Sequence, residues 1–344
     1  MKHLIKKTFI LILTLTVFLS SISIVRAEPL NGWNEDHTLY YQNSALYTGQ
    51  KKIDGKKYLF ADGKMQKGFQ TIVYKGKTIR VFYNKKTGAM VTGEKKIKGY
   101  YYYFNKKTGA MKTGWRKSKG KKYYYDKDGH MLTDHHIIKK TLYVFDSDGV
   151  LTKKVTRSKA KKATKKGKGT KTWTLMGLSE AEIVEKMGPL FTEDQEKTGV
   201  LASLSMAQFI LESWYGRSEL ALMANNCFGM KTYLSGNTWP GSAWNGSSSY
   251  TKKTKEEYTP GVETIITADF RKYPSIEKSI EDHSAYLLGA RNESGNLRYK
   301  GLKGCTNYKK AAKILWKGGY ATSRSYVKEI CAIIRNWDLT RFDA

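Results

Sequence analysis

Cysteine and histidine are scarce in this chain of 344 residues, which limits disulfide and metal chemistry. The three cysteines are an odd number, so a framework that pairs every cysteine is excluded, and one disulfide with a free thiol or three unpaired thiols are both open. Cys227 fits a small core residue better than a nucleophile. The six histidines show no metal-ligand spacing, and we expect neither a metal nor another cofactor.

Long apolar runs are also lacking beyond the first segment. Residues 1–27 combine lysines, an apolar stretch and the small-residue end Val25-Arg26-Ala27, a pattern typical of a cleaved secretory signal peptide. The run could instead act as an anchor, but its serines and threonines favour cleavage. We therefore expect a secreted protein that is not embedded in a membrane.

Acidic residues are outnumbered, with 30 Asp and Glu against 61 Lys and Arg and a formal net charge of +31. Removal of residues 1–27 takes away four bases and no acid, which leaves a charge of about +27. Such an excess favours an anionic partner. For an exported protein the partners are wall polymers such as teichoic acid, anionic lipid and peptidoglycan carboxylates, and we expect no nucleic acid.

Residues 28–152 repeat a unit of about 20 residues, of which GYYYYFNKKTGAMKTG and GKKYYYDKDGHMLTD are the clearest copies. Each copy joins a short aromatic strand to a turn rich in Gly, Asp, Asn and Lys, which predicts a β-hairpin. A hairpin cannot bury both of its faces alone, so we expect stacked copies to form a β-hairpin repeat solenoid.

This pattern resembles the cell-wall-binding repeats related to choline-binding modules. In choline-binding members an aromatic cage holds the quaternary ammonium by cation–π attraction. Here the array contains only Trp33 and Trp115, and tyrosines fill most of its aromatic positions. These tyrosines are either the solenoid core or ligand contacts, and attachment to an anionic wall polymer or a glycan fits them better than choline does.

Residues 153–172 carry ten basic residues and no acid. This composition predicts a basic, flexible linker, which acts either as a spacer or as a recognition segment. The domain that follows covers residues 173–344. Capping-box spacings at Ser179 and Thr192, helical periodicity near its end and two strand-like arms around Thr259-Pro260-Gly261 predict a mostly α domain with a β-hairpin lobe.

One predicted helix of this domain ends near a glutamate, Glu212, that has apolar neighbours in the sequence. Ser205 and Gln208 have capping-box spacing, which predicts a helix from about Met206, and Gln208 shares a face with Glu212. Loss of solvation beside Leu211 and its aromatic neighbours would raise the pKa of Glu212 toward that of a general acid. The alternative is a solvated surface glutamate.

The wording AQFILESWYGRSELA and NNCFGMK around Glu212 closely resembles the signature of the endo-β-N-acetylglucosaminidases of glycoside hydrolase family 73, which cut the glycan strand of peptidoglycan. The blocks FRKYPSIEKSIEDHSAYLL and GGYATSRSYVKEI continue the resemblance. It implies a lysozyme-like α+β fold, and it makes Glu212 the catalytic acid.

The resemblance also implies a second carboxylate, at Glu257 before the hairpin turn. Glu256 is the fallback, because neighbouring strand residues point to opposite faces. Without the resemblance, either would be a solvated strand charge. The second glutamate activates water or stabilises the oxocarbenium-like transition state, unless the substrate acetamido group is itself the nucleophile.

The substrate-binding residues that follow with less support are Tyr320, Phe228, Gly229, Gln208 and Tyr273. Tyr320 is either a cleft tyrosine or a core tyrosine, and Phe228 with Gly229 form a sugar-binding floor or the turn that packs it. The family's Asp-Pro after YAT is replaced by Ser323-Arg324. We interpret Asp282-His283 as structural.

These features together predict a secreted, wall-attached peptidoglycan hydrolase that acts as an endo-β-N-acetylglucosaminidase. A muramidase or lytic transglycosylase is the alternative among enzymes, because either can work from one helical glutamate. A non-catalytic wall-binding or adhesive protein is the alternative from another class.

Overall fold

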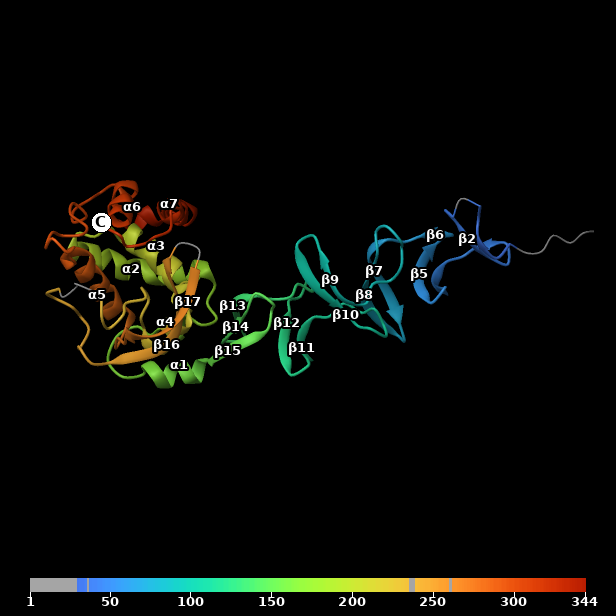
Figure 1. The fold of residues 1–344 in the computed structure, drawn as a ribbon, viewed down its shortest axis with the longest axis horizontal. Helices are drawn as coiled ribbons and strands as arrows, with labels where there is room; N and C mark the ends of the chain where they lie inside the picture. The colour runs from blue at the N-terminus through green and yellow to red at the C-terminus, as the bar shows by residue number, and fades with distance from the viewer. Residues whose placement is uncertain (1–29, 36, 235–238, 260–261) are drawn as a thin grey trace, which may run out of the picture. The chain divides into compact units, whose positions relative to one another are not determined.

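A computed structural model describes residues 30–35, 37–234, 239–259 and 262–344, with backbone positions alone for 255–259 and 262–263. The signal peptide expected at residues 1–27 lies outside this part. The chain divides into two compact units after Lys112, and Figure 1 shows their elements. No helix of the described residues is long and apolar enough to cross a membrane.

The first unit consists of successive antiparallel hairpins, as the repeats predict. They use alternating aromatic strands and tight turns at glycines. Their strands are β1 (Gly32–Trp33), β2 (Tyr40–Gln42), β3 (Ala45–Leu46), β4 (Gly49–Ile53), β5 (Lys56–Ala61), β6 (Lys64–Met65), β7 (Gly68–Tyr74), β8 (Lys77–Tyr83), β9 (Gly93–Ile97) and β10 (Tyr100–Phe104).

The Gly-x-Met element of each repeat joins neighbouring hairpins. A Cβ added at Gly88, which has a φ of +70°, would lie 1.9 Å from Met65 Sδ, so the methionine of one repeat fills the space above the glycine of the next. The Met90 N–H donates to the carbonyl of Lys57 in the preceding hairpin at 2.7 Å. Each copy therefore covers its neighbour, and the solenoid interpretation is confirmed within this unit.

The second unit, Thr113–Ala344, begins with the last repeats rather than with a separate helical domain. Their strands form a two-stranded hairpin and a three-stranded meander. The elements are β11 (Gly114–Ser118), β12 (Lys121–Tyr125), β13 (Asp134–Ile138), β14 (Thr141–Phe145) and β15 (Leu151–Thr156).

The expectation of a flexible linker at residues 153–172 is wrong. β15 pairs with β14, and α1 (Arg157–Thr164) follows directly, with the Thr156 hydroxyl accepting from the Lys159 N–H as its N-cap. Val155 and Ala160 are buried against Leu142 of the meander and Leu222 of the helical part. The apolar partners that order this basic segment come from distant sequence, which composition alone does not show.

A partly buried ion pair also joins the last repeat to the helical part. Lys153 Nζ lies 2.6 Å from the Glu219 carboxylate, which also accepts from the Tyr250 hydroxyl at 2.6 Å. Burial alone would raise the pKa of Glu219, but these two donors outweigh it and lower that pKa. The domain boundary expected near residue 152 therefore falls inside one packed unit.

The helical part has the mostly α fold with one hairpin that the sequence predicts. A two-stranded hairpin projects from helices packed around one apolar core. Its elements are the 3₁₀ turn η1 (Thr172–Leu175), α2 (Glu180–Thr198), α3 (Ala202–Ser213), α4 (Glu219–Ala224), β16 (Ser249–Thr259), β17 (Val262–Arg271), α5 (Ile276–Gly289), α6 (Tyr308–Lys317), α7 (Tyr326–Asn336) and η2 (Leu339–Phe342).

One of the two capping boxes expected before residue 200 is present. Ser179 and Glu182 exchange both bonds of the box at the start of α2. Thr192 caps nothing, because it lies inside α2 and its hydroxyl donates to the Phe342 carbonyl at 2.7 Å. The three cysteines, all within the described residues, are unpaired: Cys227 and Cys331 are buried and Cys305 is half-buried.

The docking of the last repeat predicts the effect of truncation. A fragment of residues 173–344 loses Val155, Ala160 and the lysine that pairs with Glu219, whereas a fragment of residues 151–344 keeps all three. Losing this apolar burial together with a partly exposed ion pair costs about 2–3 kcal/mol, which for a domain of this size lowers the melting temperature by roughly 5–10 °C. Circular dichroism melts of both fragments measure this. Equal melting temperatures would contradict the docking.

Candidate functional site

Helix α3 places Glu212 in its last turn, and its ends are fixed by distant residues. The helix begins at Ala202, not near Met206, because the Ala202 N–H donates to Gln195 Oε1 at 2.7 Å and the Ser203 N–H to Asp343 Oδ1 at 2.7 Å. It ends where Trp214 takes a left-handed φ of 50°. The capping box expected at Ser205 is therefore absent, because its amide already bonds within the helix.

Glu212 combines contact with solvent and a largely protein environment. Its side chain is exposed, while the surrounding protein removes enough hydration to raise the pKa of its carboxyl from 4.5 to about 7. The two facts are compatible, because the carboxyl touches water on one side while protein surrounds the rest of it. The last turn of a helix further disfavours an anion. The residue is thus accessible to a ligand and protonated to a large extent near neutral pH.

Tyr320 lies near Glu212 and is held by two stacked rings. Burial, and then the charge of Glu212, raise the pKa of the Tyr320 hydroxyl well above its usual value. That hydroxyl is hydrogen-bonded to His283 Nε2 at 3.1 Å, and the His283 ring stacks on Phe228 with centroids 3.9 Å apart and planes within 6°. The structure therefore links Phe228 to Tyr320 through His283 and places Tyr320 near Glu212.

His283 serves this chain as a neutral ring. Full burial lowers the pKa of its imidazole to about 3, so the ring carries no charge at neutral pH. The sequence interpretation of His283 as structural agrees with this placement. Phe228 is 5% exposed, so it supports the site from below, whereas Gly229 is exposed, with a φ of +69° and open space where a Cβ would lie.

Gln208 lies one helical turn before Glu212 but is fully buried. Its Nε2 donates to the Tyr326 hydroxyl at 3.0 Å. Burial, and then the charge of Glu212, raise the pKa of the Tyr326 hydroxyl. The expectation that Gln208 contacts substrate is therefore corrected: it positions Tyr326, a residue that sequence reasoning missed and whose signal was its place after the YAT block.

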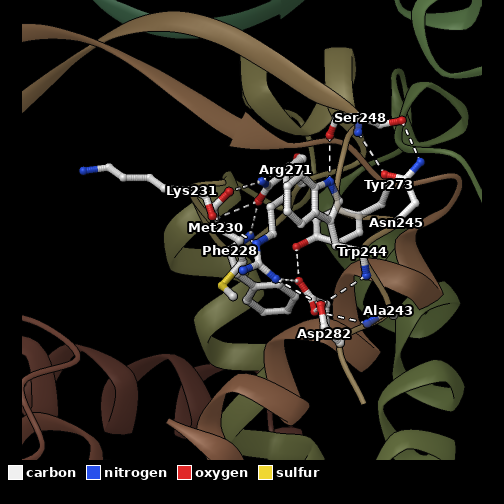
Figure 2. A network of polar contacts seen from close by, with 12 residues as sticks. Phe228, Met230, Lys231, Ala243, Trp244, Asn245, Ser248, Arg271, Tyr273 and Asp282 are labelled. Carbon is white, nitrogen blue, oxygen red and sulfur yellow. Dashed lines mark hydrogen bonds and ion pairs between the residues drawn. The ribbon is translucent and has the colours of Figure 1, made fainter. Parts of the chain in front are cut away.

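Tyr273 is likewise interior, at 2% exposure, and its hydroxyl donates to Asp282 Oδ2. Asp282 is fully buried and also accepts from Arg271 Nη1 at 2.9 Å and from the Ala243 N–H at 3.2 Å (Figure 2). Tyr273 is thus part of a polar network, not a sugar contact. The network ties the end of β17 to α5 and to the loop after residue 239.

Two tryptophans of that loop enclose the same arginine. The Arg271 guanidinium lies 4.2 Å from the Trp239 ring centroid and 4.9 Å from that of Trp244. Arg271 Nε also donates to the Lys231 carbonyl at 3.0 Å (Figure 2), which fixes the turn that follows Phe228. These tryptophans therefore pin the loop.

Glu257 lies in β16, in register with Glu263 of β17, and Glu256 is in register with Thr264. Their side chains lie outside the described part of the structure, so the choice between them stays a prediction. Within the described residues no group of three or more His, Cys, Asp or Glu could hold a metal ion.

Comparison with known proteins agrees with this arrangement. Residues 188–339 match the glucosaminidase family, described as mannosyl-glycoprotein endo-β-N-acetylglucosaminidase, and residues 112–154 match the choline-binding repeat family. The C-terminal part of the chain is thus similar to the glucosaminidase family over residues 188–339. The resemblance to glycoside hydrolase family 73 with choline-binding-like repeats is thereby confirmed.

Among curated relatives, exo-glucosaminidase LytG of Bacillus subtilis is 38% identical over 149 residues, which are 43% of this chain and 48% of the relative. A probable N-acetylmuramidase of Lactococcus lactis is 33% identical over 150 residues, 43% of this chain and 31% of the relative. The catalytic domain of the autolysin Auto from Listeria monocytogenes is 29% identical, with a TM-score of 0.39 over 49% of this chain and 93% of that one. The matched regions span half or less of these curated relatives' lengths.

The environment of the glucosaminidase domain's Glu212 predicts its titration. In ¹³C NMR of the whole chain labelled at glutamate, one carboxyl should titrate at about 7, because desolvation favours its neutral form, and Glu212→Gln should remove that signal. The buried His283 ring should stay neutral from pH 8 to pH 4. A Glu212 carboxyl that titrates near 4.5 would show that it is fully hydrated.

Proposed function

We propose that the protein is a secreted hydrolase that cleaves the glycan strand of peptidoglycan as an endo-β-N-acetylglucosaminidase. The observation that carries the proposal is an accessible carboxyl at Glu212 whose pKa is raised to about 7 by its surroundings. A glycosidase needs such an acid, because the leaving oxygen must receive a proton as its bond to the sugar breaks.

Glu212 donates its proton to the glycosidic oxygen. A raised pKa means that the protonated form dominates below about pH 7 and is lost as the pH rises through that value. Tyr320, fixed by His283, lies on the same site and offers a neutral hydroxyl to the sugar bound there. No cation is among the causes that set the Glu212 pKa, which keeps the acid available at neutral pH.

The anomeric carbon is stabilised or attacked either by Glu257 of β16 or by the substrate acetamido group. Either can stabilise the positive charge that develops at the anomeric carbon, and Glu257 can alternatively activate water. β16 pairs with β17, whose last residue is the Arg271 of the buried network, so the hairpin starts from a fixed base.

The names of the relatives differ in the glycosidic bond that is cut, after N-acetylglucosamine or after N-acetylmuramic acid, and in whether cleavage starts from the end of the strand. One is an exo-glucosaminidase and another a probable muramidase. The family description, an endo-acting glucosaminidase, supports cleavage after N-acetylglucosamine within the strand. A muramidase or lytic transglycosylase is the alternative that one helical acid also allows, and a non-catalytic wall-binding protein is the alternative if Glu212 only holds glycan.

The repeats attach the enzyme to the wall, and we propose anionic polymers rather than choline as their ligand. The chain's own cations already lie over aromatic rings: Arg80 is 4.5 Å from the Phe69 centroid and Lys96 is 5.0 Å from that of Tyr101. A quaternary ammonium would have to displace them. Lysines at the rims of these rings favour an anion instead.

The reaction is tested by mass spectrometry of peptidoglycan that has been digested and then reduced with borohydride. We expect reduced glucosamine ends on internal fragments, with Glu212→Gln slowing their release by about 10²–10⁴-fold at an unchanged melting temperature, because it keeps the shape and removes the proton. Reduced muramic ends or anhydro ends would assign the alternative chemistries. A folded Glu212→Gln variant that retains more than about a tenth of the rate would exclude Glu212 as the acid.

The repeat ligand is tested with purified walls and a fragment of residues 28–154, which keeps the repeats that match the choline-binding family. Binding should weaken as salt rises above physiological strength, where the screening length falls below about 8 Å, and after extraction of teichoic acid. Free choline should not release the fragment. Release by choline together with indifference to salt would reverse the assignment.

A further inference from the structure

A basic groove lies in the second unit, apart from Glu212. It encloses about 990 Å³ between the end of α1, the loop at residues 243–249 and the segment after β17. No acidic residue lines it, and its polar lining includes Asn245, Ser248 and Ser249. The basic side chains on its walls are Lys159, Lys162, Lys165, Lys166 and Lys272.

Helix α1 presents different residues on its different sides. Ala160 and Thr164, four residues apart, are buried. Arg157 and Lys161 lie over the Trp173 ring, at 5.2 and 5.4 Å from its centroid. The remaining lysines of the helix and its end face the groove, and among the described residues none of the groove lysines has an acidic partner within 4.0 Å.

A buried lysine holds the wall of the groove in place. Lys171 Nζ donates to the carbonyls of Lys166 at 3.2 Å and Gly167 at 3.0 Å, and it also donates to the Pro274 carbonyl. Gly167 has a φ of +84°, and a Cβ there would lie 2.5 Å from Pro274 Cβ. The backbone that carries the lysines at the end of α1 is therefore held in place without a ligand.

The opposite wall is fixed as well (Figure 2). Trp244 Nε1 donates to the Ser248 carbonyl at 2.7 Å, and Asn245 Nδ2 donates to the Ser248 hydroxyl oxygen at 2.9 Å. That hydroxyl accepts through its oxygen and retains its hydrogen for a ligand oxygen. Because Trp244 also packs on Arg271, the polar rim is anchored to the buried network.

We propose that this groove binds a segment of a phosphodiester polyanion of the glycerol phosphate type. Lysines act as point charges that suit separate phosphates along a flexible chain, and the lining holds no arginine fork of the kind that clamps a planar carboxylate. A concave groove admits a single chain but not a flat bilayer. The binding site is independent of the reaction proposed for Glu212.

The test measures fluorescence anisotropy of a labelled oligo(glycerol phosphate) of about ten units in physiological salt, with residues 113–344, the compact unit that contains the groove and lacks the repeats of the first unit. The groove variant is Lys159→Gln, Lys162→Gln and Lys166→Gln. The matched control, Lys309→Gln, Lys310→Gln and Lys313→Gln, removes the same charge from exposed positions of α6. Gln and Lys have similar helix propensities, and melting temperatures verify both folds.

We expect the groove variant to bind at least about tenfold more weakly, with a salt slope reduced by about 2–3, and the control to stay within about threefold of the parent. Equal losses in both variants, or none in the groove variant, would overturn the proposal. Equal binding of polyglutamate of the same charge would overturn the phosphodiester assignment. Lysine-dependent binding to phosphatidylglycerol vesicles would show a membrane contact instead.

Hydrolysis separates this proposal from the proposed function. The groove variant should release reducing ends from short soluble glycan chains at the parent rate, because none of the substituted lysines contacts Glu212 or Tyr320. The Glu212→Gln variant should bind the polymer like the parent. A groove variant that loses soluble-glycan hydrolysis would place these lysines in the glycan site and overturn their separate role.

Discussion

The buried pair of Arg271 and Asp282 fixes the geometry around the site. Burial of an unpaired charge costs several kcal/mol, so Asp282 is tolerable only because the guanidinium, the Tyr273 and Ser242 hydroxyls and a backbone N–H all donate to it. These donors come from the end of β17, from the segment after it and from the loop after residue 239. Loss of one partner would therefore loosen the turn after Phe228 and the rim of the groove together.

Sequence predicted the parts whose signal is local. The capping box at Ser179 was correct because both of its partners lie within four residues, and the aromatic repeats predicted hairpins because each hairpin forms from adjacent residues. The start of α3 was wrong because the groups that cap it, Gln195 and Asp343, belong to other elements. Spacing inside the helix could not show these partners.

The site shows the same division. Helical periodicity and apolar neighbours made Glu212 a candidate, and the family resemblance gave it the role of the acid; the structure supplies the expected rise in its pKa. Gln208 and Tyr273 were misplaced because a polar residue that faces the interior has the same spacing as one that faces a cleft. Only the hydroxyl of Tyr326 and the carboxylate of Asp282, both distant in sequence, determine that these two side chains point inward.

The basic segment at residues 153–172 shows why composition misleads when partners are distant. Repulsion among its lysines favours an extended chain, but the burial of Val155 and Ala160, the Trp173 ring and the ion pair with Glu219 all favour the folded form. Repulsion among exposed charges is weakened by salt, whereas apolar burial is not. The segment therefore stays folded, and the lysines of α1 that pack on no apolar partner line the groove.

The net positive charge of the chain is compatible with a raised pKa at Glu212, because distant charges are screened by salt whereas desolvation acts locally. The formal net charge of +31 would lower the pKa of the Glu212 carboxyl if its potential extended to that group. Charges farther away than about 8 Å are, however, largely screened at physiological salt. The cause that sets the Glu212 pKa is desolvation, with no cation contributing. A wall polymer, in contrast, carries charge along its whole length and meets many lysines directly. The same chain can therefore present basic surfaces to a polyanion while desolvation alone sets the pKa of Glu212.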